Sequence, residues 1–198
     1  MTTSGIASTS PAAKQIDRAD VLGELKKRVL SNIAYLNDVV ATIDAARANH
    51  KPAAGSWSAL ECIQHLNLVN RHYIAETEKK LKGLPDSPQS SYSSSFMGRQ
   101  FVKTVHPDTI GKKTPTLGSM KPEQSELNQK AVCDEAVAHS ERLLAMIETA
   151  ATKDLGGVRV KSVIGPIIRF KLGDVLRIIT LHDQRHIQQA KNAIAAAS

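Results

Sequence analysis

The sequence predicts an all-α protein, a four-helix bundle with a long crossover loop between the second and third helices. Four long segments carry apolar residues at three- and four-residue steps, which is the period of an amphipathic helix. The chain has 198 residues and is 41% hydrophobic, enough for one domain with its own core. Proline, glycine and serine gather in residues 83–122, which indicates the long connection.

The N-terminal region divides into a tail and a first helix. Residues 1–16 are rich in serine, threonine and alanine, so we expect a disordered tail, followed by a bundle domain over residues 17–198. The first helix is predicted from Asp17 to a stop before Pro52, about eight turns later. Its apolar stripe contains Leu22, Leu25, Val29, Ile33, Leu36, Val40 and Ile43.

The second helix is predicted to begin near Trp57 and to end at Gly83. Ser58 and Glu61 have the spacing of a capping box, in which two side chains satisfy free backbone N–H groups at a helix start. The apolar stripe of this helix contains Ala59, Cys62, Ile63, Leu66, Val69 and Tyr73.

The breaker-rich residues 83–122 leave room for one short helix around residues 96–105. A loop of this length either shapes the mouth of a functional pocket or forms a surface insertion. The third helix is predicted to start after Pro122 and to fray at Lys153. Residues 158–171 are expected to be an extended connector, because no partner strand is evident elsewhere. The last helix is predicted over residues 172–196.

Two histidines interrupt the buried face of the last helix. His182 and His186 continue the stripe of Leu172, Val175, Leu176 and Ile179. Imidazoles one turn apart can bind the same metal ion through neutral nitrogens. The alternative is a pair of core histidines that are hydrogen-bonded to backbone carbonyls.

The second helix offers a third histidine. His65 lies about 40° beyond Val69 around that helix, at the edge of its apolar stripe. Glu61 precedes His65 by one turn, so its carboxylate is a candidate acceptor for a hydrogen bond from an imidazole.

Two stretches resemble motifs of the DinB-like (DinB/YfiT) superfamily. Residues 57–66 (WSALECIQHL) resemble its WSxxExxxHL motif, and residues 182–189 (HDQRHIQQ) resemble its closing HxxxHxxQ motif. Residues 113–122 are similar to a pattern in one branch of the family. The resemblance extends from about residue 17 to the C-terminus. It implies a four-helix bundle in which His65, His182 and His186 hold a divalent metal ion.

The resemblance also implies a range of activities. Several relatives are enzymes that use low-molecular-weight thiols such as bacillithiol or mycothiol, and others are classed as metal-dependent hydrolases. We therefore expect a metal-dependent transferase or hydrolase that acts on a small molecule, with zinc or nickel as the ion, iron as a further option, and a thiol as a candidate co-substrate. Relatives are often dimers, so a homodimer is a further expectation.

Two other function classes compete with this reading. The first is a non-catalytic, stress-related protein that binds a metal or a small ligand. The second is a basic helical protein that binds nucleic acid, suggested by the net charge of +7. Aromatic residues make up only 4% of the chain, which leaves few platforms for stacking bases, so we expect no nucleic-acid partner. No apolar run or signal-peptide core is evident, so we expect a cytoplasmic protein without membrane attachment.

Several further residues are candidates for the neighbourhood of the histidines. Gln189 follows His186 by less than one turn and is expected to orient a ligand or an imidazole. Trp57 is expected to fix the entry of the second helix or to line the pocket, and His72 is a candidate pocket residue. Cys62 is interpreted as a buried structural thiol.

We expect no catalytic residue beyond the metal ligands. The nearest carboxylate, Asp183, follows His182 directly and therefore points about 100° away from it around the helix. The HDQRH sequence also lacks the glutamate of the HExxH motif, which argues against a metalloprotease.

Overall fold

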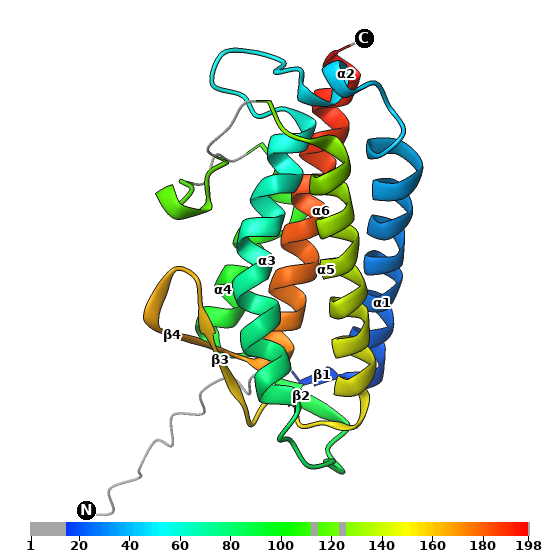
Figure 1. Cartoon of the computed structure of the whole chain (residues 1–198). Coiled ribbons are helices and arrows are strands. Elements are labelled where there is room, and N and C mark those ends of the chain that lie inside the picture. Colours follow the sequence, from blue (N-terminus) through cyan, green and yellow to red (C-terminus); the bar gives the residue numbers. More distant parts are fainter. Residues whose placement is uncertain (1–14, 112–114, 123–125, 198) are drawn as a thin grey trace, which may run out of the picture.

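The computed structural model describes residues 15–111, 115–122 and 126–197, and the long helices in these ranges form a four-helix bundle (Figure 1). The all-α fold class predicted from the sequence is confirmed. The helices of the bundle are α1 (Arg18–Tyr35), α3 (Ala59–Leu81), α5 (Gln129–Thr149) and α6 (Leu172–Ala196). The shorter helices are η1 (Leu36–Val40), α2 (Ala45–Asn49), α4 (Phe96–Val105), η2 (Pro107–Thr109), η3 (Gly118–Met120) and η4 (Ala150–Thr152). The strands are β1 (Gln15–Asp17), β2 (Ser91–Ser93), β3 (Arg159–Ser162) and β4 (Gly165–Lys171).

The first predicted helix is divided into three pieces. After α1 the chain continues as the π-helical segment η1, and α2 follows after a break. The break has a local cause, because the Asp44 side chain accepts hydrogen bonds from the backbone N–H groups of Ala46 and Arg47 and so caps a new helix. The apolar stripe nevertheless continues through η1, where Leu36 and Val40 are buried.

The second helix, α3, begins with the predicted capping box. The backbone N–H of Glu61 donates to Ser58 Oγ at 3.1 Å, and the backbone N–H of Ser58 donates to Glu61 Oε2 at 2.9 Å. The third helix, predicted to start after Pro122, begins later as α5, because Asn128 accepts a hydrogen bond from the Ala131 N–H and caps the helix there.

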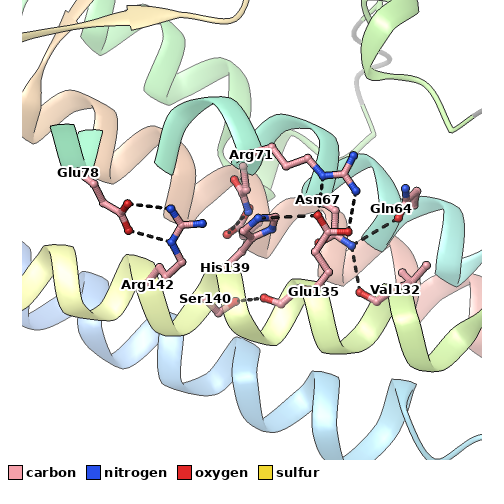
Figure 2. A network of polar contacts seen from close by, with 12 residues as sticks. Gln64, Asn67, Arg71, Glu78, Val132, Glu135, His139, Ser140 and Arg142 are labelled. Carbon is pink, nitrogen blue, oxygen red and sulfur yellow. Dashed lines mark hydrogen bonds and ion pairs between the residues drawn. The ribbon is translucent and has the colours of Figure 1, made fainter. Parts of the chain in front are cut away.

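Paired charges align α3 with α5 (Figure 2). Arg71 on α3 donates to both carboxylate oxygens of Glu135 at 2.6 and 2.8 Å. In the second pair the arginine is on α5 and the glutamate on α3: Arg142 donates to both oxygens of Glu78 at 2.9 and 2.7 Å. Bidentate pairs add geometric specificity even where exposure limits their energy. These pairs therefore fix the axial register of the two helices.

The segment between α3 and α5 contains the short helix predicted around residues 96–105, which is α4. The preceding strand β2 pairs with β1 in antiparallel register, with Ile16 opposite Tyr92. Gln15 and Ile16, which were expected in the disordered tail, therefore belong to a strand. The rest of that expected tail, residues 1–14, lies outside the described residues.

Residues 158–171 correct the predicted extended connector. They form a β-hairpin in which β3 pairs with β4, with Val160 opposite Phe170 and Lys161 opposite Arg169. Val160 and Phe170 are buried, whereas Lys161 and Arg169 face outward, which is the alternation of a half-buried strand pair. The prediction failed because each strand finds its partner within the same short segment.

The last helix, α6, has the predicted bounds and joins two apolar cores. One core includes Tyr73, Ile178 and Leu181, and the other includes Ile63 and Ile187. The division between them falls on α6 after Leu181 and before Ile187. The buried polar side chains of Asp183, Arg185 and His186 lie in this interval, so a polar layer separates the two cores. Within the described ranges, none of the helices combines the length and the apolar character that a membrane crossing requires.

The start of α6 is fixed by contacts with α4 and β2. The buried Asp174 carboxylate accepts hydrogen bonds from Ser94 Oγ at 2.5 Å and from the backbone N–H and hydroxyl of Ser95, each at 3.1 Å. Gly173 meets the buried Tyr92 ring so closely that a Cβ there would lie 2.4 Å from Tyr92 Cζ. The close approach requires glycine at this position.

We therefore expect Gly173→Ala to lower the free energy of unfolding by about 1–3 kcal/mol, because the Tyr92 ring must move out of a packed core. Gly23 on the exposed face of α1 is the matched control, because a Cβ there meets nothing within 4 Å. Gly23→Ala should raise the free energy of unfolding by about 0.5–1 kcal/mol. Urea unfolding of the three proteins measures both changes, and equal stability of Gly173→Ala and wild type would contradict the close packing.

Candidate metal centre

Three histidines from two helices converge in the polar layer. His65 comes from α3, and His182 and His186 come from adjacent turns of α6. One ring nitrogen from each histidine lies within 4.8 Å of the others. The Nε2 atoms of His65 and His182 are 3.3 Å apart. Two nitrogens bound to one tetrahedral zinc ion at 2.0–2.1 Å would be about 3.3–3.4 Å apart, so this spacing suits a shared ion.

The Met120 carbonyl fixes the tautomer of His65. His65 Nδ1 is 2.7 Å from the Met120 oxygen. A carbonyl only accepts hydrogen bonds, so Nδ1 carries the proton and Nε2 presents a lone pair toward His182. Such an acceptor behind a ligating imidazole is the usual support of a histidine metal ligand. Sequence reasoning missed this contact, because Met120 is 55 residues from His65 and contributes only its backbone.

All three imidazoles are held neutral. Burial lowers the pKa of His65, and it lowers the pKa of His182 to about 3. Burial also lowers the pKa of His186 well below its usual value, with the neighbouring histidines adding to the effect. Neutral imidazoles have the free lone pair that a metal ion needs, so all three side chains could bind an ion at neutral pH.

The donor set fits a divalent transition metal. The buried Nδ1 atoms of His182 and His186 have no hydrogen-bond partner among the described residues, which is costly for polar atoms in a core. Imidazole suits zinc, nickel, iron and copper alike, and three protein ligands leave a coordination position open. The cluster can therefore hold an ion that also contacts a ligand.

The histidines lie on the wall of a cavity of about 710 Å³. This volume is within the usual range of small-molecule sites, about 300–1,000 Å³. Trp57 lines the cavity, and its ring centroid is 5.0 Å from that of His65 and 6.0 Å from that of His186. Gln189 lines the cavity too, three residues after His186 on α6. The structure thus brings Trp57 and Gln189 to the histidines.

Two other candidates from the sequence are placed elsewhere. Glu61 does not accept from an imidazole: one carboxylate oxygen accepts from the Ser58 backbone and the other pairs with Lys51 Nζ at 2.9 Å. The helix cap competes for this carboxylate, and the Met120 carbonyl serves His65 in its place. His72 packs edge-on against Tyr73 and is not among the described residues that line the cavity.

Arg185 is a cavity residue that the helical pattern did not identify. The pattern assigns it to the polar side of the last helix, yet it is buried and lines the cavity. Its guanidinium donates to Thr109 Oγ1 at 2.6 Å and to the His106 carbonyl at 3.5 Å. The chain around η2 covers this side of α6, which a helical pattern taken alone cannot show.

Asp183 is buried on the other side of the polar layer. Both of its oxygens accept from the Asn70 amide, at 3.1 and 3.2 Å, and burial raises the pKa of the carboxyl to about 7. Asp183 is not among the described cavity residues, which agrees with its predicted direction around α6. The hydrogen bond joins α3 to α6 beside the histidines.

Both cysteines are poor nucleophiles. Cys62 lines the cavity but is only 2% exposed, and burial with the nearby Glu61 charge raises the pKa of its thiol to about 12. Burial and the Asp134 charge raise the pKa of Cys133 to about 11. At neutral pH almost no thiolate is present, so the structural role expected for Cys62 agrees with its surroundings.

One comparison with known proteins found a relationship. A family model for the DinB superfamily matches residues 29–190, from within α1 to α6. The matched span contains all three histidines. No curated protein and no solved structure shows significant similarity to the chain.

The lowered histidine pKa values predict that metal-free protein loses stability as the pH falls from 7 to 5. Below pH 6.5 the unfolded chain binds protons that His182, with its folded pKa of about 3, does not. In His182→Leu this contribution is absent, so the loss between pH 7 and 5 should be smaller by about 2 kcal/mol. The contribution of Asp183 to the pH dependence of stability has the opposite sign, because the pKa of this carboxyl is raised in the folded state. Asp183 is present in both proteins, so its contribution does not account for a difference between them. Urea unfolding with a chelator at the two pH values tests this, and identical losses would count against a buried neutral His182.

The raised thiol pKa values predict that both cysteines of the native protein react slowly with Ellman's reagent at pH 8. In the time that the unfolded protein needs for complete reaction, neither native thiol should react. In guanidinium chloride both thiols should react at once, because unfolding restores an ordinary pKa of about 8.5. The absorbance of the released thionitrobenzoate gives the count. Rapid reaction of one thiol in the native protein would contradict the burial of Cys62 and Cys133.

Proposed function

The chain belongs to the DinB superfamily, and from this premise we propose that it is a metal-dependent enzyme that acts on a small molecule. His65, His182 and His186 would hold a divalent ion, zinc or nickel first and iron as the further option. One observation carries the proposal: three neutral imidazoles with ring nitrogens within 4.8 Å of one another lie on the wall of a ligand-sized cavity. A purely structural metal site has no need of such a cavity.

A bound divalent ion supplies positive charge that lowers the pKa of a coordinated thiol or water. The chain's own residues prepare the site for this. The Met120 carbonyl holds the His65 ring in one tautomer, and Gln189 lies near His186 in the cavity wall. The Trp57 ring lies at a tilt beside the imidazoles of His65 and His186, and it gives this part of the wall an apolar surface.

The lining of the cavity favours a thiol-dependent transferase over a hydrolase. Among the described residues, no carboxylate lines the cavity, so no acidic side chain is placed to take a proton from water. A thiol bound to the ion would be deprotonated outright, whereas bound water would keep a pKa near 7 and would gain from a base that this cavity lacks. The buried Cys62 thiol is no substitute nucleophile. We propose that a low-molecular-weight thiol is the co-substrate and that hydrolysis is the second candidate.

The cytoplasmic location and the homodimer remain predictions from the sequence.

Metal content and turnover in matched variants test the proposal. Elemental analysis should find one divalent ion per wild-type chain, and His182→Ala should lower the metal affinity more than about 100-fold, since loss of an outer partner alone costs 10–100-fold. His72→Ala is the control, because it lies on the same helix as His65 but outside the cavity, and it should keep both metal and activity. Consumption of thiols in the presence of electrophilic acceptors should occur with wild type and disappear in His65→Ala.

The other function classes give different results. A protein that binds one ion per chain but consumes no thiol and cleaves no ester would be a non-catalytic binder. That result would overturn the proposal that the chain is an enzyme. Protein that carries no ion and whose stability does not respond to added zinc overturns the metal site itself. Salt-sensitive binding to DNA or RNA, retained in His182→Ala, would instead support the nucleic-acid reading.

A further inference from the structure

We propose that the substrate of this site is amphiphilic, with a polar head at the three histidines and an apolar tail of several carbons between α4 and the β3–β4 hairpin. The position of the head rests on the proposed function. The position of the tail follows from the shape and chemistry of the cavity wall, and it does not require the ion.

The cavity is elongated, and the histidines lie near its middle. Along α6 its lining extends from Ile178 to Ala193, which is about 22 Å of helix. Along α3 it extends from Cys62 to Tyr73. The two helices are antiparallel (Figure 1), so the Tyr73 end of one lies beside the Ile178 end of the other. The cavity therefore has two arms, one on each side of the histidines.

The two arms differ in chemistry. The arm toward the start of α6 is bordered mainly by apolar side chains, namely Val69, Tyr73, Phe101, Val105, Ile178 and Ile179. The Tyr73 hydroxyl is already hydrogen-bonded to Ser162 Oγ at 2.9 Å, so it has little capacity left for a polar ligand. Thr104 is the polar exception and lies on the exposed face of α4. We name this the apolar arm.

The opposite arm is richer in polar groups. Ser56, Gln189 and Asn192 border it, together with the rings of Trp57 and Pro52 and the methyl group of Ala193. A ligand that spans the histidines would thus meet hydrogen-bonding groups on one side and hydrocarbon on the other. Water finds few hydrogen-bond partners in the apolar arm, whereas an alkyl group there exchanges part of its contact with water for contact with apolar side chains.

Exposed apolar side chains border the cavity. Leu117 is 44% exposed and Ile164 is 38% exposed, and both line it. Large apolar groups at the edge of a concave site offer hydrocarbon surface against which the apolar part of a ligand can pack. Ile167 in the same hairpin is 92% exposed but is not among the lining residues, so it provides an internal control.

Alkyl hydroxamates test the inference, because they combine a metal-binding head with a tail of chosen length. The zinc-loaded protein is titrated calorimetrically with straight-chain hydroxamates of two, four, six and eight carbons. The dissociation constant should fall about three- to fourfold for each added methylene until the apolar arm is filled. An affinity that is independent of chain length would overturn the inference, even if every hydroxamate binds.

Matched hairpin variants locate the tail. Ile164→Ser should reduce the gain in affinity from the longest chain severalfold, and Ile167→Ser should leave it unchanged. Both side chains are exposed, so both variants should fold. An equal effect of the two substitutions, or no effect of either, would show that the tail does not lie against the hairpin.

A metal-independent titration separates the tail from the proposed function. Metal-free wild type should bind octan-1-ol more tightly than butan-1-ol, with shifts in the isoleucine methyl NMR signals that are smaller in Ile164→Ser. His182→Ala should lose hydroxamate affinity for every chain length but keep the binding of octan-1-ol. If the protein holds no metal, the proposed function fails, and the titrations with alcohols still test the apolar arm. Equal affinity for octan-1-ol and butan-1-ol would then overturn the inference that this arm binds an alkyl tail.

Discussion

The burial of α6 is the constraint on which the rest of the structure depends. The buried face of this helix has no water for its polar side chains, so these side chains need partners within the protein. Asp174 receives its hydrogen bonds from the turn before α4, and Asp183 receives them from α3. Arg185 donates to the residues around η2. These contacts place α3, α4 and η2 around α6, and the space that they leave between them is the cavity beside the histidines.

The polar layer separates two apolar cores that would be more stable as one. Buried nitrogens of His182 and His186 without partners cost free energy that leucine at the same positions would not. Proteins tolerate such local conflicts mainly at functional sites. The cores on either side supply the compensating burial, with Tyr73 and Ile178 packed on one side and Ile63 on the other. The histidines therefore lie between two packed apolar cores, as expected where side chains must be in position before a ligand binds.

Sequence reasoning succeeded where local signals were strong. The bounds of α6, the capping box of α3 and the short helix α4 all follow from periodicity, capping residues and breakers. It failed where the deciding partner is distant in the sequence or is backbone. Residues 158–171 had no evident partner strand elsewhere in the sequence, because the two strands of the hairpin pair with each other. The helical pattern assigned Arg185 to the polar side of α6, but the residues around η2 cover this side chain. The two motifs identified the three histidines, but only the folded chain shows Met120 behind His65.

The convergence of α3 and α6 also sets the order in which the site is made. His65 and His182 are 117 residues apart in the chain. At the usual pace of translation, about 5–20 residues per second, the ribosome adds His182 roughly 6–23 seconds after His65. During that interval the nascent chain offers one imidazole of the three, and a single imidazole holds a metal ion weakly. Binding of a metal ion by all three imidazoles would thus have to follow the synthesis and docking of the last helix.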